Sequence, residues 1–474
     1  MAILLYTWLT LTTFGYRGWM HQLAKAFKKA GFSLEKVNFE VYKLPESFAV
    51  EPLLQESLCT ESAFWEIDED EAAAGTLPPQ TDTGIQMAVD VDAGQPNLTP
   101  CWQLRRPEGC TSSFDHARRK WARERDREQN GHVPRSETLK KHVLDANVES
   151  LEFDTESVKV TFGAYSAVET KQPDARAVNS VEKLVTEHSF RYVEWKGIMG
   201  RVYTDSKDRI CAILAGRPDD PKYLAAADSV YDLMKKEALE AGLTNIVAHR
   251  RGHFPAVNVG ITHGNGTDGP INLDNGKYTE LVNKLLCNQN VKRLASFASA
   301  CFQMWMPKVY GYYRTYLDKL FSTIPSLRRI FPRSIFPTAA FNFGPNVWTF
   351  RHKDKFNCPF GMCAIQALGR FNPTKGGHII LWELKLIIEF PPASTILIPS
   401  ATISHSNIPV ADGDERASFT QYCPGGLFRY VDAGFRKEKD LRVQDPILYE
   451  KLKVSRGGMW RLGLELWSRP MDFH

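Results

Sequence analysis

The chain has 474 residues, 43% of them hydrophobic, which is enough for two or three domains or one large domain with insertions. Its formal net charge is only +4, so attraction to a polyanion must come from local clusters of charge. The nine cysteines form no C-x-x-C pair, which excludes paired zinc spacing and is typical of reduced thiols in an intracellular protein. No stretch reaches the about 18 to 20 apolar residues of a membrane span, so no membrane partner is expected.

The first 150 residues predict two regions of different character. Residues 1–60 are expected to form an N-terminal segment of helix and strand. Residues 61–150 predict a partly disordered linker, acidic over 61–71 and basic over 114–128. The basic run has alternating signs and favours an exposed helix, with phosphate contact or a nuclear import signal as the alternatives.

Residues 151–474 have the pattern of one folded domain. Strands are predicted at 157–165 and 189–197, followed by a hairpin over 200–218. A helix then begins at Asp219 or Asp220 with a proline in its first turn, and Gly242 ends it. The Gly- and His-rich segment 249–270 predicts either a surface loop or a lid facing the substrate. Aromatic helices are expected over 278–321.

Eight short strands are predicted in the following region, with proline and glycine at the corners between them. They are expected at 337–343, 347–353, 363–369, 377–384, 384–390, 394–400, 405–410 and 416–423. This is the number that a double-stranded β-helix, or jelly roll, requires. The predicted fold class is therefore α+β, with a jelly-roll barrel at about 337–423 buttressed by helices, and with an N-terminal extension.

Three side chains in this region match the 2-His-1-carboxylate triad that binds non-haem Fe(II) and leaves positions open for ligands. His352 and Asp354 close one predicted strand, and His405 opens another. A chance His-x-Asp is common in a chain with twelve histidines, so hydrogen-bonded strand-end histidines are the alternative. Arg416 follows His405 by eleven residues, where its guanidinium is suited to the far carboxylate of 2-oxoglutarate.

Longer motifs surround these residues: FNFGP at 341–345, GGHIILWEL at 376–384, FPPASTILIPSATISHSN at 390–407 and RASFTQYCPGGLFRYVDAGF at 416–435. Together they resemble the fungal branch of the TET/JBP family. Members of this family are Fe(II)- and 2-oxoglutarate-dependent dioxygenases that oxidise the methyl group of modified bases in DNA, and many of their genes accompany transposons. The resemblance is dense from about residue 197 to residue 434.

The resemblance implies a role for each residue that matches its motifs. Iron would be bound by His352, Asp354 and His405, and the 2-oxoglutarate carboxylate by Arg416. Ser418 on the same strand and Asn342 on the first barrel strand would complete the co-substrate site. The implied cofactors are Fe(II) and 2-oxoglutarate, the implied partner is double-stranded DNA with methylated bases, and the implied location is the nucleus.

Residues near the triad predict how a base would be selected. Phe350 lies two residues before His352, and on one strand both would share a face, so Phe350 is expected either to line the pocket or to pack the barrel. An apolar wall favours 5-methylcytosine over N6-methyladenine, whose N–H would lack a partner. The product would be 5-hydroxymethylcytosine, with further oxidation as an extension. Basic side chains expected to contact DNA are Arg250, Arg251, Lys353 and Lys355.

Two other functions remain open at this stage. One is an N6-methyladenine DNA demethylase with the same mechanism. The other is a non-catalytic DNA-binding accessory protein of a transposon. Dioxygenases that act on proteins or small molecules use the same triad, so the predicted barrel does not exclude them.

Overall fold

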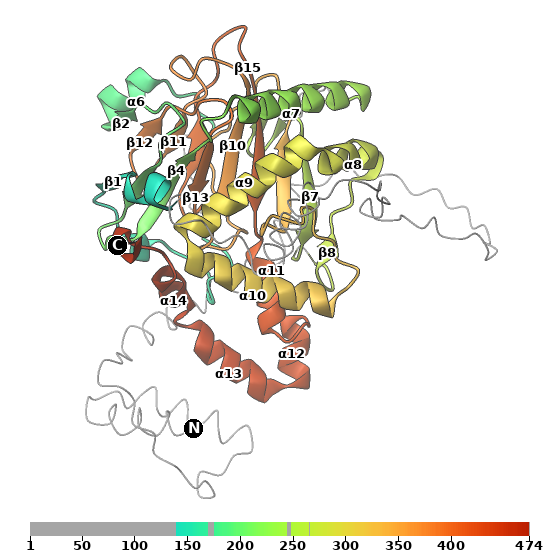
Figure 1. Cartoon of the computed structure of the whole chain (residues 1–474). Helices are drawn as coiled ribbons and strands as arrows, with labels where there is room; N and C mark the ends of the chain where they lie inside the picture. The colour runs from blue at the N-terminus through green and yellow to red at the C-terminus, as the bar shows by residue number, and fades with distance from the viewer. Residues whose placement is uncertain (1–138, 169–174, 244–247, 265, 474) are drawn as a thin grey trace, which may run out of the picture. The chain divides into compact units, whose positions relative to one another are not determined.

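The computed structural model describes residues 139–168, 175–243, 248–264 and 266–473 (Figure 1). The predictions for residues 1–138, which include the N-terminal segment and most of the linker, lie outside the described residues. All described residues belong to one unit by their internal contacts. Among the helices in these ranges, none is long and apolar enough to cross a membrane.

The larger sheet has nine strands in the order β1-β3-β4-β13-β10-β15-β9-β7-β8. At its centre, four strands predicted from the sequence pair antiparallel with their neighbours: β13 (Thr395–Ile398), β10 (Cys363–Arg370), β15 (Glu415–Tyr422) and β9 (Thr338–Asn342). The outer strands are β1 (Asn147–Ser150), β3 (Arg201–Thr204), β4 (Ile210–Gly216), β7 (Ala256–Thr262) and β8 (Ile271–Asn272). The predicted hairpin is confirmed as β3 and β4.

The smaller sheet has four strands in the order β14-β11-β12-β2. These strands are β14 (His405–Asn407), β11 (Ile379–Leu381), β12 (Leu386–Ile388) and β2 (Arg191–Val193). Leu381 and Ile388 of this sheet share an apolar core with Ala364 and Ile396 of the larger sheet. These two sheets therefore pack face to face, and their described strands do not join into one closed barrel.

Seven of the eight strands predicted between residues 337 and 423 are present, most of them shorter than expected. The prediction for 347–353 is wrong, because this segment forms one isolated bridge, His352 with His405, and a second bridge, Asn346 with Arg416, lies just before it. Its backbone hydrogen bonds are divided between strands and loops: the Val347 N–H donates to the Arg416 carbonyl of β15 at 3.1 Å, and the Phe350 N–H donates to the Arg251 carbonyl in a turn at 2.8 Å. The segment is therefore held between strands without belonging to one.

Two further predictions for strands and loops are corrected. The segment 249–270 is not a loop, because it contains β7 and the hairpin of β5 (Ala248–His249) and β6 (Gly252–His253). In β7 the inward residues are hydrophobic, but Gly260 interrupts the hydrophobic–polar alternation by which a strand is recognised in a sequence. A Cβ at Gly260 would lie 2.2 Å from the Pro337 carbonyl oxygen. The strand expected at 157–165 is reduced to one bridge between Val160 and Ala167.

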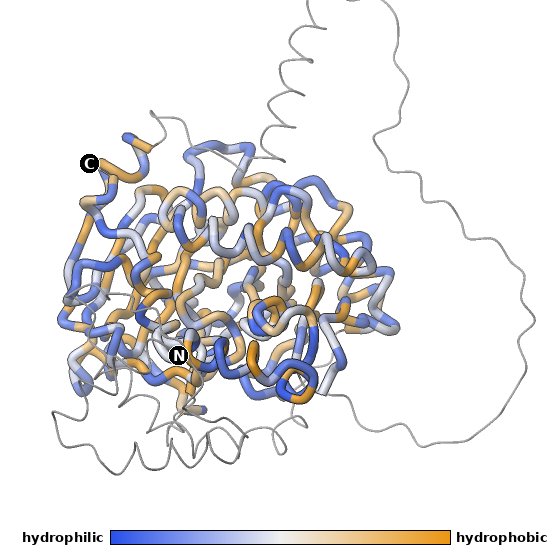
Figure 2. The backbone as a smooth tube through the Cα atoms, turned by 90° about the horizontal axis from the view of Figure 1, so that it is seen from below, coloured by the Kyte–Doolittle hydropathy of each residue, from blue (hydrophilic) through white to orange (hydrophobic). Residues whose placement is uncertain are grey.

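Helices cover the outer face of the larger sheet (Figure 1). They are α7 (Pro221–Glu240), α8 (Thr279–Cys287) and α9 (Gln289–Trp305), followed by α10 (Pro307–Thr323). The predicted start of α7 is confirmed, since Asp220 accepts a hydrogen bond from the Lys222 N–H at 2.9 Å. On the smaller sheet, α6 (Val181–His188) packs Leu184 against Ile380 and Ile387. Figure 2 shows hydrophobic segments running through the interior.

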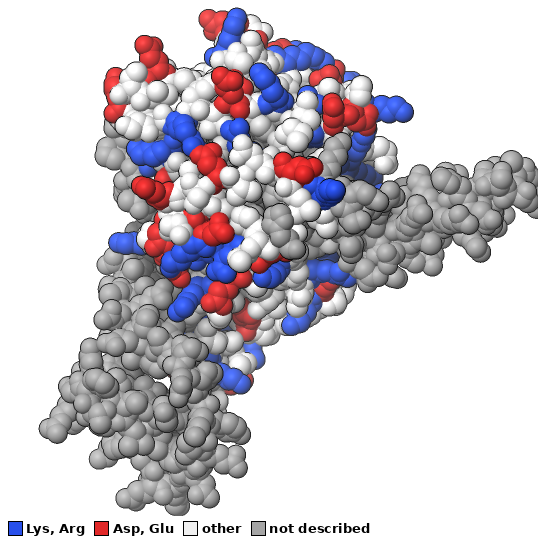
Figure 3. Space-filling model, turned by 60° about the vertical axis from the view of Figure 1, so that its left-hand side comes forward, with Lys and Arg blue, Asp and Glu red and all other residues white. Residues whose placement is uncertain are grey.

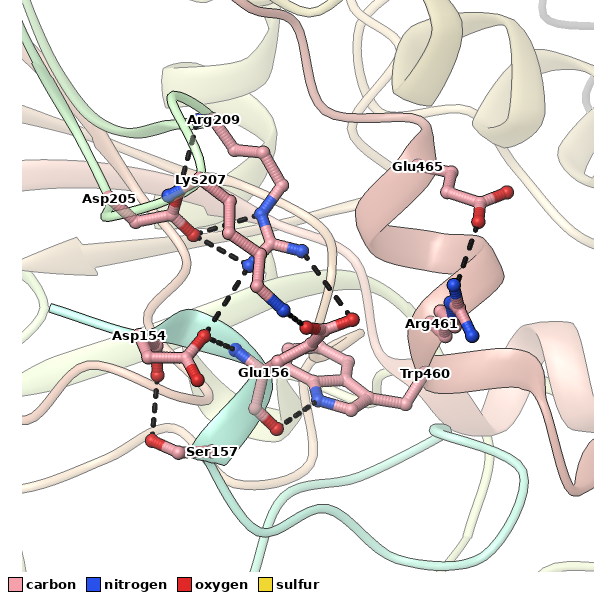
Figure 4. A network of polar contacts seen from close by, with 9 residues as sticks. All are labelled: Asp154, Glu156, Ser157, Asp205, Lys207, Arg209, Trp460, Arg461 and Glu465. Carbon is pink, nitrogen blue, oxygen red and sulfur yellow. Dashed lines mark hydrogen bonds and ion pairs between the residues drawn. The ribbon is translucent and has the colours of Figure 1, made fainter. Parts of the chain in front are cut away.

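The C-terminal part of the chain forms α11 (Gly425–Asp432), α12 (Glu438–Gln444), α13 (Pro446–Arg456) and α14 (Met459–Glu465). A polar network joins the start of the domain to the β3–β4 turn and α14 (Figure 4). Buried Arg209 bonds Asp205 at 2.8 Å, and Trp460 Nε1 of α14 donates to the Glu156 carbonyl at 3.3 Å. Basic and acidic side chains alternate over the face shown in Figure 3.

Candidate metal centre and co-substrate site

Three side chains converge where the segment after β9 crosses the start of β14. His352 and His405 are antiparallel bridge partners, which places their rings side by side with centroids 4.3 Å apart. The Asp354 N–H donates to the Ser400 carbonyl at 2.9 Å, so the carboxylate is turned back toward the two rings. The structure thus brings together the three residues that the sequence pattern singled out.

The ligand atoms lie close enough to share one ion. Nε2 of His352 and Nε2 of His405 each lie 3.8 Å from an oxygen of Asp354. The ligand atoms of all three residues lie within 4.8 Å of one another, and among the described residues this is the one group of three His, Cys, Asp or Glu side chains so placed. Among the described residues, no second candidate metal site is formed by His249, His253 and His263.

Hydrogen bonds fix which nitrogen of each histidine faces the site. His352 Nδ1 lies 2.7 Å from the Phe350 carbonyl, and His405 Nδ1 lies 3.1 Å from the Ile403 carbonyl. A carbonyl only accepts, so both Nδ1 atoms carry the hydrogen and both Nε2 atoms present a lone pair. Metal-bound histidines are oriented in this way. Two lone pairs and a carboxylate facing one another without a donor between them suit a bound cation, and they disfavour the alternative of ordinary strand-end histidines.

The protonation states also fit metal binding. Burial, together with the nearby His405, holds the pKa of His352 well below its usual value, so the ring is neutral at pH 7. Burial acts to raise the pKa of Asp354, but the electrostatic effects of His352, His405 and Arg251 outweigh it and lower the pKa to about 2. A neutral imidazole and an ionised carboxylate are the forms that bind a metal ion.

Arg416 is a buried cation that has no acidic partner among the described residues. It is 1% exposed and lies between Phe371 and Phe390, with Cζ 5.8 Å from each ring centroid. Its Nη1 donates to the Val347 carbonyl at 2.6 Å, whereas Nε has no partner. Burial lowers the pKa of Arg416 to about 10, so the guanidinium stays charged at neutral pH. An unpaired buried charge is strongly destabilising, and a ligand carboxylate at this position would relieve it.

Ser418 and Asn342 lie beside this arginine, opposite each other on β15 and β9. The Asn342 amide donates to the Ser418 hydroxyl at 2.9 Å, which leaves the hydroxyl hydrogen for a ligand; the Asn342 Oδ1 is buried without a partner. Strand alternation places Arg416 and Ser418 on the face opposite Phe419, which packs in the helix-covered core. Both therefore face the space between the sheets.

The basic side chains expected to contact DNA divide into two groups. Lys353 is 14% exposed and lies 3.4 Å from the Glu383 carboxylate, so it acts as an internal ion-pair partner and is poorly placed for phosphate. Arg250 Nη1 donates to the Lys353 carbonyl at 3.2 Å, which ties the β5–β6 hairpin to the ligand segment. The charge of Arg251 reaches Asp354, and Lys355 lies on the turn that follows Asp354.

Phe350 is buried, but the reasoning that placed it at the pocket wall does not apply. Alternation requires a continuous strand, and residues 347–353 do not form one. The Phe350 ring meets His253 and Trp348 edge-on, each with a centroid distance of 5.2 Å. Its backbone carbonyl does contribute, because it accepts the hydrogen bond that orients His352.

Tyr422 is a site residue that the sequence reasoning did not select. Burial raises the pKa of this phenol, the charge of Arg251 lowers it and the charge of Asp354 raises it. Tyr422 ends β15 and is only partly buried. The signal was present in the sequence, because counting in steps of two from Arg416 through Ser418 reaches Tyr422 on the same strand face.

Fold and site together define an α+β protein with two packed sheets and one candidate mononuclear metal centre. No family model and no curated protein sequence matches the chain. Among solved structures, NgTET1 in complex with 5mC DNA is 11% identical, covering 52% of this chain and 89% of that chain, with a TM-score of 0.38. An oxidoreductase of the 2OG-Fe(II) oxygenase family from Burkholderia pseudomallei is 16% identical, covering 36% and 67%, with a TM-score of 0.21. Similarities this low support no conclusion about function. The functional assignment rests on the geometry of the site.

Proposed function

We propose that this protein is an Fe(II)- and 2-oxoglutarate-dependent dioxygenase that oxidises the methyl group of 5-methylcytosine in DNA. One observation carries the proposal: a 2-His-1-carboxylate cluster lies in a fold that also holds an unpaired, fully buried arginine, Arg416, facing the space between the sheets. The cluster suits Fe(II), and the arginine suits the far carboxylate of a dicarboxylic co-substrate. A structural zinc site would not require the buried Arg416.

The strand order supports this assignment. The chain passes from β9 in the larger sheet to the His352 bridge at β14 and back to β10. It then runs through β11 and β12 in the smaller sheet, β13 in the larger, β14 in the smaller and β15 in the larger. This alternation between two sheets is that of a double-stranded β-helix in which the His352 bridge replaces one strand.

The side chains of this protein would hold and orient the reactants. Bound iron and 2-oxoglutarate would supply the oxidant that hydroxylates a C–H bond. His352, Asp354 and His405 would hold the ion. Arg416 would fix the far carboxylate of the co-substrate, and the Ser418 hydroxyl would donate a second hydrogen bond. Phe371 and Phe390 exclude water from the guanidinium, which strengthens its pairing with a carboxylate.

DNA is proposed as the substrate because the sequence motifs resemble TET/JBP enzymes and because Arg250, Arg251 and Lys355 lie on segments beside Asp354. A base within a duplex must leave the stack to reach such a site. Tyr422 offers an aromatic surface near the ligands on which an extruded base would stack. A nuclear location would follow from this substrate.

The proposal is tested with purified protein, Fe(II), 2-oxoglutarate and a duplex that carries 5-methylcytosine, with nucleosides and succinate measured by mass spectrometry. We expect 5-hydroxymethylcytosine together with succinate. A matched duplex with N6-methyladenine tests the alternative substrate, and product from that duplex alone would contradict 5-methylcytosine as the base. A DNA-binding accessory protein would bind the duplex and form no succinate, and that result would exclude catalysis.

A further inference from the structure

The three candidate ligands differ in exposure, and this difference shows on which side the metal site opens. The side chains of His352 and His405 are 4% and 7% exposed, whereas that of Asp354 is 19% exposed. A substrate must therefore approach past Asp354. On this side the chain forms a turn at 354–357. A hydrogen bond from the Asn357 N–H to the Asp354 carbonyl at 2.9 Å closes the turn.

Phe356 occupies this turn and is 55% exposed. A single exposed apolar side chain is ordinary, but the backbone that carries this one is fixed on both sides. The Lys355 carbonyl accepts from the Ala167 N–H at 2.8 Å, and the Phe356 carbonyl accepts from the Gly425 N–H at 2.8 Å. The ring is thus held in solvent by a rigid support, two residues from a metal ligand.

One cationic side chain lies beside the ring, and two more are carried by a hairpin bonded to the same segment. Lys355 Nζ lies 5.2 Å from the centroid of the Phe356 ring. The β5–β6 hairpin, which carries Arg250 and Arg251, is bonded to the same segment through the Lys353 carbonyl. An aromatic ring beside a positive charge is the combination that binds the bases and the phosphates of nucleic acids.

We propose that Phe356 inserts into the base stack of duplex DNA next to the target base and supports its extrusion toward the metal site. The inference rests on the function proposed above and adds a positioning residue to it. Extrusion costs unstacking energy, and proteins that open base steps commonly insert an apolar side chain between them. The position of Phe356 would hold the opened step beside Asp354, so the freed base has a short path to the ligands.

The test compares Phe356→Ala and Phe356→Tyr with a control, Val443→Ala, which removes an apolar side chain that is 80% exposed on α12. The first measurement uses iron-free protein and a duplex with 2-aminopurine beside one 5-methylcytosine. The parent protein, Phe356→Tyr and Val443→Ala should raise the fluorescence of the unstacked 2-aminopurine. Phe356→Ala should lose most of that rise while still binding the duplex.

The second measurement is kcat/KM on the duplex and on the same strand alone. Phe356→Ala should lose about tenfold or more on the duplex and little on the single strand, since loss of base–aromatic stacking weakens binding by roughly that factor. An equal loss on both substrates, or an unchanged fluorescence rise in Phe356→Ala, would overturn the inference. A Phe356-dependent rise without any base oxidation would leave the insertion standing and would refute the proposed reaction.

Discussion

His352 and His405 exchange both of their backbone hydrogen bonds, with the His352 N–H donating at 3.1 Å and the His405 N–H donating at 2.9 Å. This reciprocal pair holds two candidate ligands side by side through the backbone, before any ion is bound. The side-chain bonds to the Phe350 and Ile403 carbonyls then set the ring orientation. The site is therefore preorganised, and its geometry does not depend on the metal to form.

It follows that removing a ligand should abolish metal binding without unfolding the protein. His352→Ala or Asp354→Ala should bind Fe(II) too weakly for turnover, because two ligands hold the ion poorly. The thermal midpoint of the metal-free protein should change little relative to the parent. Iron content after gel filtration and succinate formation are the measurements. Near-normal turnover at limiting iron in either variant would refute the ligand assignment.

Arg416 should show opposite effects on stability and on co-substrate binding. Because its buried charge has no acidic partner, Arg416→Met should leave the free energy of unfolding of the ligand-free protein unchanged or increase it. The same variant should lose 2-oxoglutarate-dependent turnover, because it no longer holds the far carboxylate of the co-substrate. Arg416→Lys should raise the 2-oxoglutarate concentration needed, since an ammonium lacks the planar fork.

The check for Arg416 is thermal unfolding with and without 2-oxoglutarate. The co-substrate should stabilise the parent protein and not Arg416→Met, because a ligand raises the stability of the state that binds it. If 2-oxoglutarate stabilises Arg416→Met as much as the parent protein, another cation must bind the co-substrate carboxylate.

The basic residues near the site should differ in their effect on DNA binding. Arg250→Ala and Lys355→Ala should each lower the affinity and reduce the slope of log affinity against log salt by about 1, as expected for one phosphate contact. Lys353→Ala should leave that slope unchanged, because Lys353 is paired with Glu383. A salt titration of duplex binding decides this, and an equal change in slope for Lys353→Ala would show that the ion pair opens on DNA.

His378 should make the protein less stable in mild acid. It is fully buried, and burial lowers its pKa to about 4, an effect that Glu389 partly offsets. The unfolded chain has a histidine pKa of about 6.5, so between these values the unfolded state binds one more proton and stability falls as pH falls, by about 1.4 kcal/mol per unit. His378→Gln should remove this component. Denaturant unfolding at several pH values measures how the free energy of unfolding depends on pH. The same dependence in His378→Gln would show that His378 is not its cause.

Local patterns gave most of the strands and the ligand triplet. The alternation in β9 and β15 and the cap of α7 depend on neighbours in sequence, so they were predictable. The segment 347–353 has the same alternation, but its backbone hydrogen bonds are divided among β14, β15 and loops distant in sequence, so no continuous strand pairing forms. Lys353 was predicted to contact DNA because no local sequence pattern indicates its ion pair with Glu383.

The co-substrate site was predictable in part. The spacing from His405 located Arg416, but only the structure shows that its buried charge lacks an acidic partner. Phe356 and Tyr422 were missed because their roles depend on exposure and on which segments meet around Asp354. Exposure of one aromatic ring in a buried region is a tertiary property that composition and periodicity do not encode.

Isotopically labelled dioxygen tests the central claim most directly. The parent protein is incubated with Fe(II), 2-oxoglutarate and a 5-methylcytosine duplex under labelled dioxygen, and both products are examined by mass spectrometry. A dioxygenase should place one labelled oxygen atom in succinate and the other in the hydroxymethyl group of the base. Succinate without label, or a hydroxymethyl oxygen drawn from water in the absence of succinate, would contradict the proposed function.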